Sequence, residues 1–500
     1  MKKMKILIVA YLVVFSLLGC TANQDDEAMN GRDNNNEVRN VGYQRDNGDV
    51  REIRDNRNDG NQARVQGTNE ARSRIAEAPD TQAQIKNVIF LIGDGMGVTY
   101  TSAYRYWKDN PDTATVERTE FDKNLVGNQM TYPEDPEQNV TDSAASGTAM
   151  STGHKTYNAA IAVENDRTEI KTVLEAAKGK GKATGLVVTS ELTHATPASF
   201  GAHDVDRKNM DSMANDYYDE MINGQHKIDV MLGGGRNNFV RSDRNLPEEF
   251  KKAGYSYVTN RQELLNNKNN RILGIFAPAG LPKMIDRTEE IPSLEEMTNA
   301  AISRLSKDKD GFFLMIEGSQ IDWAGHDNDV VSAMSEMQDF EKSYKAAIEF
   351  AKKDKHTLVV ATADHSTGGF SIGANGIYNW FPAPIKAAKR TPDFMANEIV
   401  NKGADIEATL KQYIGLELTA EEVKSVKDAA EQGKADKDKG LVKVDNAIES
   451  IFNKRSNTGW TTGGHTGEDV AVFAFGPGKE RFAGQKDNTD HPKVIFDILK

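Results

Sequence analysis

The chain has 500 residues, of which 38% are hydrophobic and 27% are charged, a composition typical of a soluble globular protein. Its formal net charge of −13 argues against a general binder of nucleic acids or anionic membranes. The single cysteine excludes an intrachain disulfide and any cluster of thiolate ligands. A bound metal would therefore need carboxylate, imidazole and hydroxyl ligands, which suit ions that prefer oxygen and nitrogen.

The N-terminus predicts export. The basic start MKKMK precedes an apolar run over 6–18 that is too short to span a bilayer, which is typical of a signal peptide over 1–19. The following Leu-Leu-Gly-Cys sequence, ending at Cys20, resembles the lipobox of bacterial lipoproteins. We expect an exported protein, periplasmic or on the cell surface, anchored to the membrane through a lipid on Cys20. An ordinary signal peptide with a chance cysteine is the alternative.

Residues 20–84 differ in composition from the rest of the chain. Asn, Asp, Arg, Gly and Gln dominate this segment, and Tyr43 is its only aromatic residue. Such a segment cannot bury enough apolar surface to offset the entropy that ordering would cost. We therefore predict a disordered polar linker, with a partner-binding arm as the alternative.

Four apolar runs, 88–92, 184–189, 312–316 and 357–361, are typical of strands buried on both faces of a sheet. Helical patterns separate them, for example over 173–178 and 334–352. This alternation predicts an α/β fold with a large, mostly parallel central sheet flanked by helices on both faces. In such a fold, ligands bind beyond the carboxyl ends of the strands.

Polar side chains that could bind a metal follow each predicted strand, and one more histidine lies in a glycine-rich turn near the C-terminus. Each of them alone has an ordinary explanation, such as a turn residue, an ion pair or a solvated helix face. Together they could form two or three cation sites suited to Zn²⁺ and Mg²⁺. The candidates are Asp94, Thr196, Glu317, Asp322, His326, Asp364, His365 and His465.

The sequence TDSAASGTAMSTG, which starts at Thr141, provides a candidate nucleophile. Thr141 or Asp142 can cap a helix that carries Ser143 in its first turn, where free backbone amides attract an anion. A serine hydroxyl needs a base or a metal to become reactive, and no histidine is adjacent in the sequence. Ser146 and Ser151 are rival nucleophiles deeper in the helix. A small-residue helix that only packs against the sheet is the alternative.

Six motifs resemble those of the alkaline phosphatases, in the same order, from residue 93 to residue 467. They are GDGMG, TDSAASGTAMSTG, ELTHATPASFGAHDVDR, IEGSQIDWAGH, TADH and GGHTG. The resemblance implies hydrolysis of many phosphate monoesters, with no nucleic-acid partner, through a phosphoserine intermediate. It also implies two zinc ions and one magnesium ion at the edge of the sheet, and a homodimer.

The resemblance further implies a role for each site residue. Ser143 matches the nucleophile, and Arg207 matches the guanidinium that grips two phosphate oxygens, a contact that lysine cannot reproduce. The implied ligands of the first zinc are Asp322, His326 and His465. Those of the second zinc are Asp94, Asp364 and His365. The implied ligands of the magnesium are Asp94, Thr196 and Glu317.

Two features depart from some bacterial members of this family. His194 and Trp323 stand where those members carry Asp and Lys, which leaves the identity of the third metal open and should weaken product binding. Within the predicted catalytic domain, 85–500, residues 371–460 form an insert with helical patterns over 405–413, 419–431 and 446–454. This insert could cover the site, join a dimer interface or only pack.

Two other functions stay open at this stage, and a third is disfavoured. A phosphodiesterase or nucleotide pyrophosphatase could use the same metal scaffold, although Arg207 would grip oxygens that a diester has esterified. A sulfatase is disfavoured because its Cys-x-Pro-x-Arg or Ser-x-Pro-x-Arg motif is missing from the sequence. A non-catalytic surface lipoprotein could bind metals for stability alone.

Overall fold

The computed structural model describes residues 84–500. The predicted signal peptide, Cys20 and the predicted linker up to residue 83 lie outside the described residues, so export and lipid anchoring stay predictions. Within 84–500, no helix is both long enough and apolar enough to cross a membrane.

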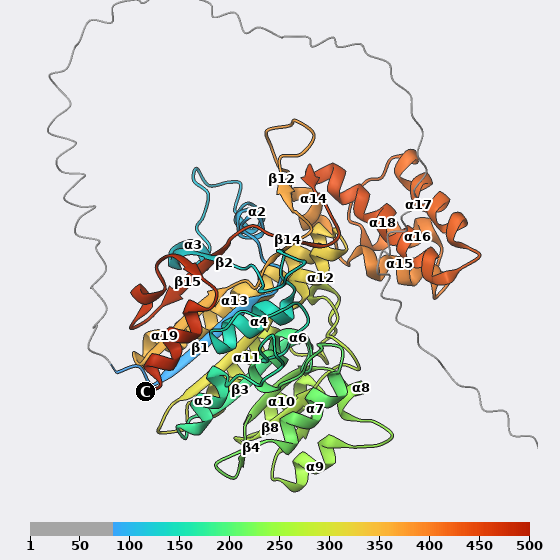
Figure 1. Ribbon diagram of the computed structural model, residues 1–500. Coiled ribbons are helices and arrows are strands. Elements are labelled where there is room, and N and C mark those ends of the chain that lie inside the picture. The colour runs from blue at the N-terminus through green and yellow to red at the C-terminus, as the bar shows by residue number, and fades with distance from the viewer. Residues whose placement is uncertain (1–83) are drawn as a thin grey trace, which may run out of the picture. The chain divides into compact units, whose positions relative to one another are not determined.

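A ten-stranded sheet runs through the centre of the described residues (Figure 1). All neighbouring strands are parallel except β15, which runs antiparallel to β10 and to β2. This confirms the predicted, mostly parallel α/β sheet. In spatial order the strands are β16 (Gly484–Asp487), β2 (Leu125–Met130), β15 (Val470–Phe475), β10 (Thr357–Thr362), β1 (Asn87–Gly93), β9 (Phe312–Gly318), β3 (Ala183–Glu191), β6 (Val230–Gly234), β8 (Ile272–Ile275) and β7 (Ser256–Val258).

Helices cover both faces of the sheet, as predicted. Ile89 and Leu91 of β1 belong to one apolar core, while Val88, Phe90 and Ile92 belong to the other, because successive side chains of a strand point to opposite faces. The first core contains residues from α2 (Val98–Lys108), α11 (Leu294–Leu305) and α13 (Val330–Asp354). The second contains residues from α4 (Ser143–Thr152), α5 (Val173–Gly179), α6 (Ala195–Gly201) and α19 (Asp490–Ile498).

The four strands predicted from the sequence lie next to one another. They are β10, β1, β9 and β3, in that spatial order and all parallel. Their carboxyl ends therefore meet at one edge of the sheet, where an α/β fold binds its ligands. The structure thus places the polar residues that follow these strands within reach of one another.

Five helices and two short strands make up residues 371–460, which we call the insert. Its two ends meet because β12 (Ser371–Ile372) pairs with β13 (Thr458–Gly459). Apolar side chains of the insert join the same core as those of α13. The last helix begins earlier than predicted. The helices are α14 (Pro382–Ala387), α15 (Pro392–Val400), α16 (Ile406–Tyr413), α17 (Ala420–Gly433) and α18 (Lys437–Ser456).

The remaining elements are short and connect the sheet to its helices. They are α3 (Glu120–Asn124), α7 (Met210–Asp219), β4 (Met221–Ile222), β5 (Gln225–His226), α8 (Arg236–Phe239), α9 (Leu246–Lys252), α10 (Arg261–Asn266), η1 (Met284–Asp286), α12 (Gln320–His326), β11 (Ser366–Thr367), β14 (His465–Thr466) and η2 (Lys479–Phe482).

Candidate active site

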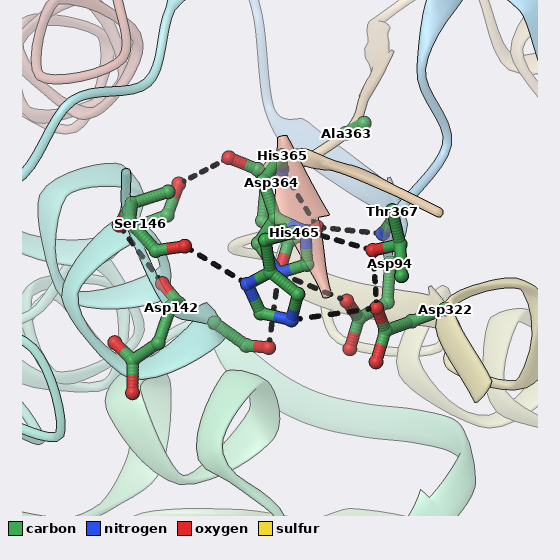
Figure 2. A network of polar contacts seen from close by, with 12 residues as sticks. Asp94, Asp142, Ser146, Asp322, Ala363, Asp364, His365, Thr367 and His465 are labelled. Carbon is green, nitrogen blue, oxygen red and sulfur yellow. Dashed lines mark hydrogen bonds and ion pairs between the residues drawn. The ribbon is translucent and has the colours of Figure 1, made fainter. Parts of the chain in front are cut away.

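Polar side chains that follow or end the four central strands converge at the carboxyl edge of the sheet. Figure 2 shows four residues of this region, Asp94, Asp322, Asp364 and His365. Asp94 follows β1, Glu317 lies in β9, and Asp364 and His365 follow β10. Thr196 lies in α6, shortly after β3. All five residues are fully buried. So many buried polar groups at one place need a compensating partner, because an unpaired buried charge is costly.

One group of possible metal ligands consists of Asp322, His326 and His465. Helix α12 places the first two one turn apart, as the sequence predicted, and Nε2 of His326 lies 3.3 Å from Oδ2 of Asp322. Nε2 of His465 lies 3.6 Å from Oδ1 of Asp322 and 3.1 Å from Nε2 of His326. The Nδ1 atoms of the two histidines contact the carbonyl oxygens of Gly463 and Thr141, at 2.7 and 2.9 Å. These contacts leave both Nε2 atoms free to bind a metal.

A second group consists of Asp94, Asp364 and His365. Oδ1 of Asp364 accepts hydrogen bonds of 3.0 Å from the backbone amides of Gly95 and His365, while its Oδ2 lies 3.0 Å from Nε2 of His365. Both carboxylate oxygens of Asp94 are buried and lack a hydrogen-bond partner among the described residues. Burial and the charge of Asp364 raise the pKa of Asp94 well above its usual value. A cation at this position would remove that penalty.

A third group consists of Asp94, His194 and Glu317. Oε2 of Glu317 accepts a hydrogen bond of 2.6 Å from the hydroxyl of Ser319, whereas Oε1 is buried without a partner in the described part of the chain. The hydroxyl of Thr196 is also buried and unpartnered there. Burial raises the pKa of Glu317 to about 7. The predicted ligands Asp94, Thr196 and Glu317 thus lie in one region, to which the structure adds His194.

Ser143 is the first residue of α4 and is almost fully buried. Asp142 caps this helix by accepting a hydrogen bond of 2.9 Å from the amide of Ala145. The hydroxyl of Ser143 lies 3.2 Å from Nε2 of His365, so it borders the second group of ligands. The hydroxyls of the rival serines, Ser146 and Ser151, instead donate to the backbone carbonyls of Asp364 and Thr148.

Arg207 lies at the N-terminal end of α4. Its Nη1 donates to Oδ2 of Asp142 at 3.1 Å, and its Nη2 lies 3.2 Å from Nε2 of His194. Burial and the charge of Arg207 lower the pKa of His194 to about 3, so the ring is neutral and accepts the hydrogen bond from the guanidinium. The remaining guanidinium hydrogens and the free amides of the helix end would attract an anion.

Sequence reasoning missed Thr367. Its hydroxyl donates to Oδ1 of Asp322 and lies 3.3 Å from Nδ1 of His365, so it links the first two groups of ligands. Thr367 pairs with His465 through the two-residue strands β11 and β14. Strands this short leave no recognisable pattern in the sequence. The contact of His194 with Arg207 was likewise unexpected, although the residue itself had been noted.

Comparison with known proteins identifies the family of this site. A family model described as alkaline phosphatase matches residues 85–500, which include every residue of the three groups. The chain belongs to the alkaline phosphatase family. It is 70% identical over 422 residues to alkaline phosphatase 3 of Bacillus subtilis (strain 168), a match that covers 84% of this chain and 90% of that relative.

Solved structures of alkaline phosphatases share the fold. The cold-active enzyme of a psychrophilic Shewanella species is 40% identical, with a TM-score of 0.75 over 83% of this chain and 100% of that one. A mutant alkaline phosphatase of the Antarctic bacterium TAB5, with magnesium bound, is 30% identical, with a TM-score of 0.60 over 83% of this chain and 98% of that one.

The chain is therefore an enzyme that hydrolyses phosphate monoesters to an alcohol and inorganic phosphate. Its site contains groups of residues that can hold metal ions, in keeping with the buried, unpartnered carboxylates described above.

Proposed function

We propose that Ser143 is the nucleophile and that hydrolysis proceeds through a phosphoserine intermediate. The observation that carries this proposal is the position of the Ser143 hydroxyl, at the N-terminus of α4 and 3.2 Å from Nε2 of His365. The free amides and positive end of this helix favour the approach of a dianionic phosphate.

The donor atoms support two zinc ions and one magnesium ion. All three groups combine carboxylates with at least one imidazole. The first two suit zinc, whereas the third, with the hydroxyl of Thr196 beside its two carboxylates, offers mainly oxygen atoms, which suits magnesium. When bound, the ions would lower the pKa of the serine, stabilise the leaving oxygen and activate a water. The proposed ligand sets are Asp322, His326 and His465; Asp94, Asp364 and His365; and Asp94, Thr196 and Glu317.

The proposed reaction has two displacements at phosphorus. Arg207 binds two non-bridging oxygens of the phosphate, with Asp142 and His194 holding its guanidinium in place. The Ser143 oxygen attacks, a serine O–P bond forms, and the bond from phosphorus to the leaving alcohol oxygen breaks. Water then attacks the phosphoserine, the serine O–P bond breaks, and inorganic phosphate leaves. These contacts recognise only the phosphate, so we propose broad specificity for the alcohol.

We further infer that the enzyme is exported and anchored through a lipid on Cys20, as the sequence MKKMK, the apolar run over 6–18 and the Leu-Leu-Gly-Cys segment predict. The division into a signal peptide (1–19), linker (20–84) and catalytic domain with an insert (371–460) rests on the same sequence. A homodimer is proposed from the family resemblance alone.

Replacing Ser143 with Ala tests the assigned nucleophile. We expect Ser143→Ala to lower kcat for an aryl phosphate monoester by at least about a thousandfold, because a direct attack by water lacks the positioned oxygen. Ser151→Ala, on the same helix, is the matched control and should keep most of the activity. Steady-state kinetics on the monoester, with the corresponding diester as a second substrate, would measure both effects.

Monoester turnover that survives Ser143→Ala would remove this nucleophile. Wild-type hydrolysis of the diester at a higher kcat/KM than the monoester would favour a phosphodiesterase instead.

A further inference from the structure

The backbone of residues 159–162, which we call the 159–162 segment, has an unusual conformation. Ala159 and Ala162 have φ angles of 77° and 46°, in the left-handed region that residues other than glycine rarely adopt. Ala160, Ile161 and Ala162 are fully buried. Such a backbone is strained and persists only where the surrounding structure holds it, and strain of this kind is concentrated at functional sites.

This segment supports the phosphate-binding arginine. The amide of Arg207 donates a hydrogen bond of 2.9 Å to the carbonyl oxygen of Ala159, and Ile161 exchanges two backbone hydrogen bonds of 2.9 Å with Asp204. The amide of Ala159 donates at 3.0 Å to Oδ2 of Asp142, the oxygen that also accepts from Nη1 of Arg207. The position of the guanidinium therefore depends on the conformation of the 159–162 segment.

His203 holds the other end of the segment. Its Nδ1 lies 2.9 Å from the carbonyl oxygen of Ala162, and its Nε2 lies 2.9 Å from Oε1 of Glu175. Both partners are acceptors, so the ring makes both hydrogen bonds only when both of its nitrogens carry a proton. Burial lowers the pKa of His203, but the hydrogen bond with Glu175 outweighs this and raises the pKa above its usual value.

The partner of His203 is itself fixed in place. Oε2 of Glu175 accepts a hydrogen bond of 3.0 Å from the amide of Thr172 and so caps α5. Nζ of the fully buried Lys227 lies 3.7 Å from Oε1 of Glu175 and forms an ion pair with Glu220. Glu175, His203 and Glu220 lie close enough together to hold a metal ion, but the Lys227 ammonium already supplies a cation beside both carboxylates.

We propose that His203 is a positioning residue for Arg207, because its hydrogen bond to Ala162 keeps the strained segment in the conformation that orients the guanidinium. Both ring nitrogens bind protein acceptors, so neither is left to bind the substrate. Without the bond to Ala162, the segment can relax toward an ordinary backbone conformation and take the contact between Ala159 and Arg207 with it. The inference rests on the proposed role of Arg207 in binding phosphate.

Two substitutions separate the two hydrogen bonds of His203. The amide nitrogen of Asn reaches about as far as Nδ1 of a histidine, and that of Gln about as far as Nε2. His203→Asn therefore keeps the bond to Ala162, whereas His203→Gln keeps only the bond to Glu175. The matched control is His491→Gln, which replaces a buried histidine of α19 whose Nε2 has no hydrogen-bond partner in the described part of the chain.

Steady-state kinetics of the full-length enzymes, with zinc and magnesium supplied, give kcat and KM for an aryl phosphate and the inhibition constant of inorganic phosphate. We expect His203→Gln to raise KM and the inhibition constant by about fivefold to tenfold, with a smaller change in kcat, because the grip on phosphate is what weakens. His203→Asn and the control His491→Gln should both stay within about twofold of wild type.

A double-mutant cycle shows whether the effect passes through the arginine. Arg207→Ala alone should raise the inhibition constant of phosphate, and adding His203→Gln to it should change nothing further, because the group that His203 positions is then missing. An inhibition constant that Arg207→Ala leaves unchanged would remove the proposed role of Arg207 itself. If Arg207→Ala raises it, a wild-type value in His203→Gln, or an additive effect in the double variant, overturns the positioning role alone.

Equal losses in His203→Gln, His203→Asn and His491→Gln would reflect a general loss of stability and would also overturn the proposal. Should His203→Gln fail to fold, Thr148→Val takes its place. The Thr148 hydroxyl donates to the carbonyl oxygen of Ala160 at 2.9 Å and accepts from the amide of Ala162 at 2.8 Å, so it holds the same segment. Thr148→Val should raise the inhibition constant severalfold, and an unchanged value would refute the link between this segment and Arg207.

Discussion

At the scale of single residues, Asp142 connects the nucleophile to the phosphate-binding arginine. One carboxylate oxygen caps α4 through the amide of Ala145, while the other accepts hydrogen bonds from Nη1 of Arg207 and from the amide of Ala159. The same side chain therefore fixes the start of the helix that carries Ser143 and the orientation of the guanidinium. The sequence indicated that Asp142 could cap the helix, but not that it contacts Arg207.

Substituting Asp142 should separate these two functions. We expect Asp142→Ala to raise both KM and the inhibition constant of phosphate by about tenfold, because Arg207 loses its orientation, and to lower stability by about 1 kcal/mol through the lost cap. Asp142→Asn keeps an oxygen for the cap, so it should weaken phosphate binding with a smaller loss of stability. Phosphate inhibition kinetics and urea unfolding measure the two effects, and an unchanged inhibition constant in both variants would contradict this account.

At the scale of elements, the pairing of β11 with β14 assembles the metal ligands. Register places Thr367 opposite His465 and Ser366 opposite Thr466, which brings a histidine from beyond the insert next to His365. Ring centroids of His365 and His465 lie 3.6 Å apart. Figure 2 shows their side chains together with those of Asp94 and Asp322. A break in this short pairing would separate the first and second groups of ligands.

Thr367 provides a test of this assembly. We expect Thr367→Val to weaken zinc binding by about 10–100-fold, because the hydroxyl that orients Asp322 and His365 is lost while the shape of the side chain is kept. Thr466→Val is the matched control, since that hydroxyl has no hydrogen-bond partner within the described chain. Competition with a zinc chelator measures the affinity, and equal zinc retention in the two variants would rule out the orienting role.

At the scale of the whole molecule, the buried ionisable groups make stability depend on pH and on metal. In the metal-free chain, burial disfavours charge on His326, but its hydrogen bond with Asp322 outweighs this and raises its pKa to about 9. The pKa of Glu449 rises to about 10. Both folded-state values exceed those of the unfolded chain, so the folded state holds extra protons.

The metal-free enzyme should therefore lose stability as the pH rises from 7 to 10, because those extra protons are released in that range. A metal ion held by Asp322, His326 and His465 would take the place of the proton on His326, so the metal-loaded enzyme should lose less stability, and the difference in apparent Tm between the two forms should widen by several degrees. Thermal unfolding with and without a chelator at pH 7 and pH 10 measures this. A constant difference between the two forms would count against it.

The sequence by itself determined the parallel sheet and the place of the site. Continuous apolar runs marked β1, β3, β9 and β10, and the carboxyl ends of parallel strands must meet at one edge, so Asp94, Glu317 and Asp364 could be placed together in advance. Asp322 and His326 were one turn apart on any helix. These predictions succeed because residues close together in the sequence determine the hydrophobic periodicity of a strand or helix. The alternation of strands and helices then determines that the strands run parallel.

Only the tertiary structure decided the contacts between segments far apart in the chain. Three contacts depend on how loops and helices pack: that of Thr367 with Asp322, that of His194 with Arg207, and that of α18 with the loop at Asn328. In each case, the sequence around one residue of the contact gives no indication of the other. The buried acids Asp445 and Glu449 look like an ordinary charged helix face in the sequence, and packing of the insert is what removes them from water.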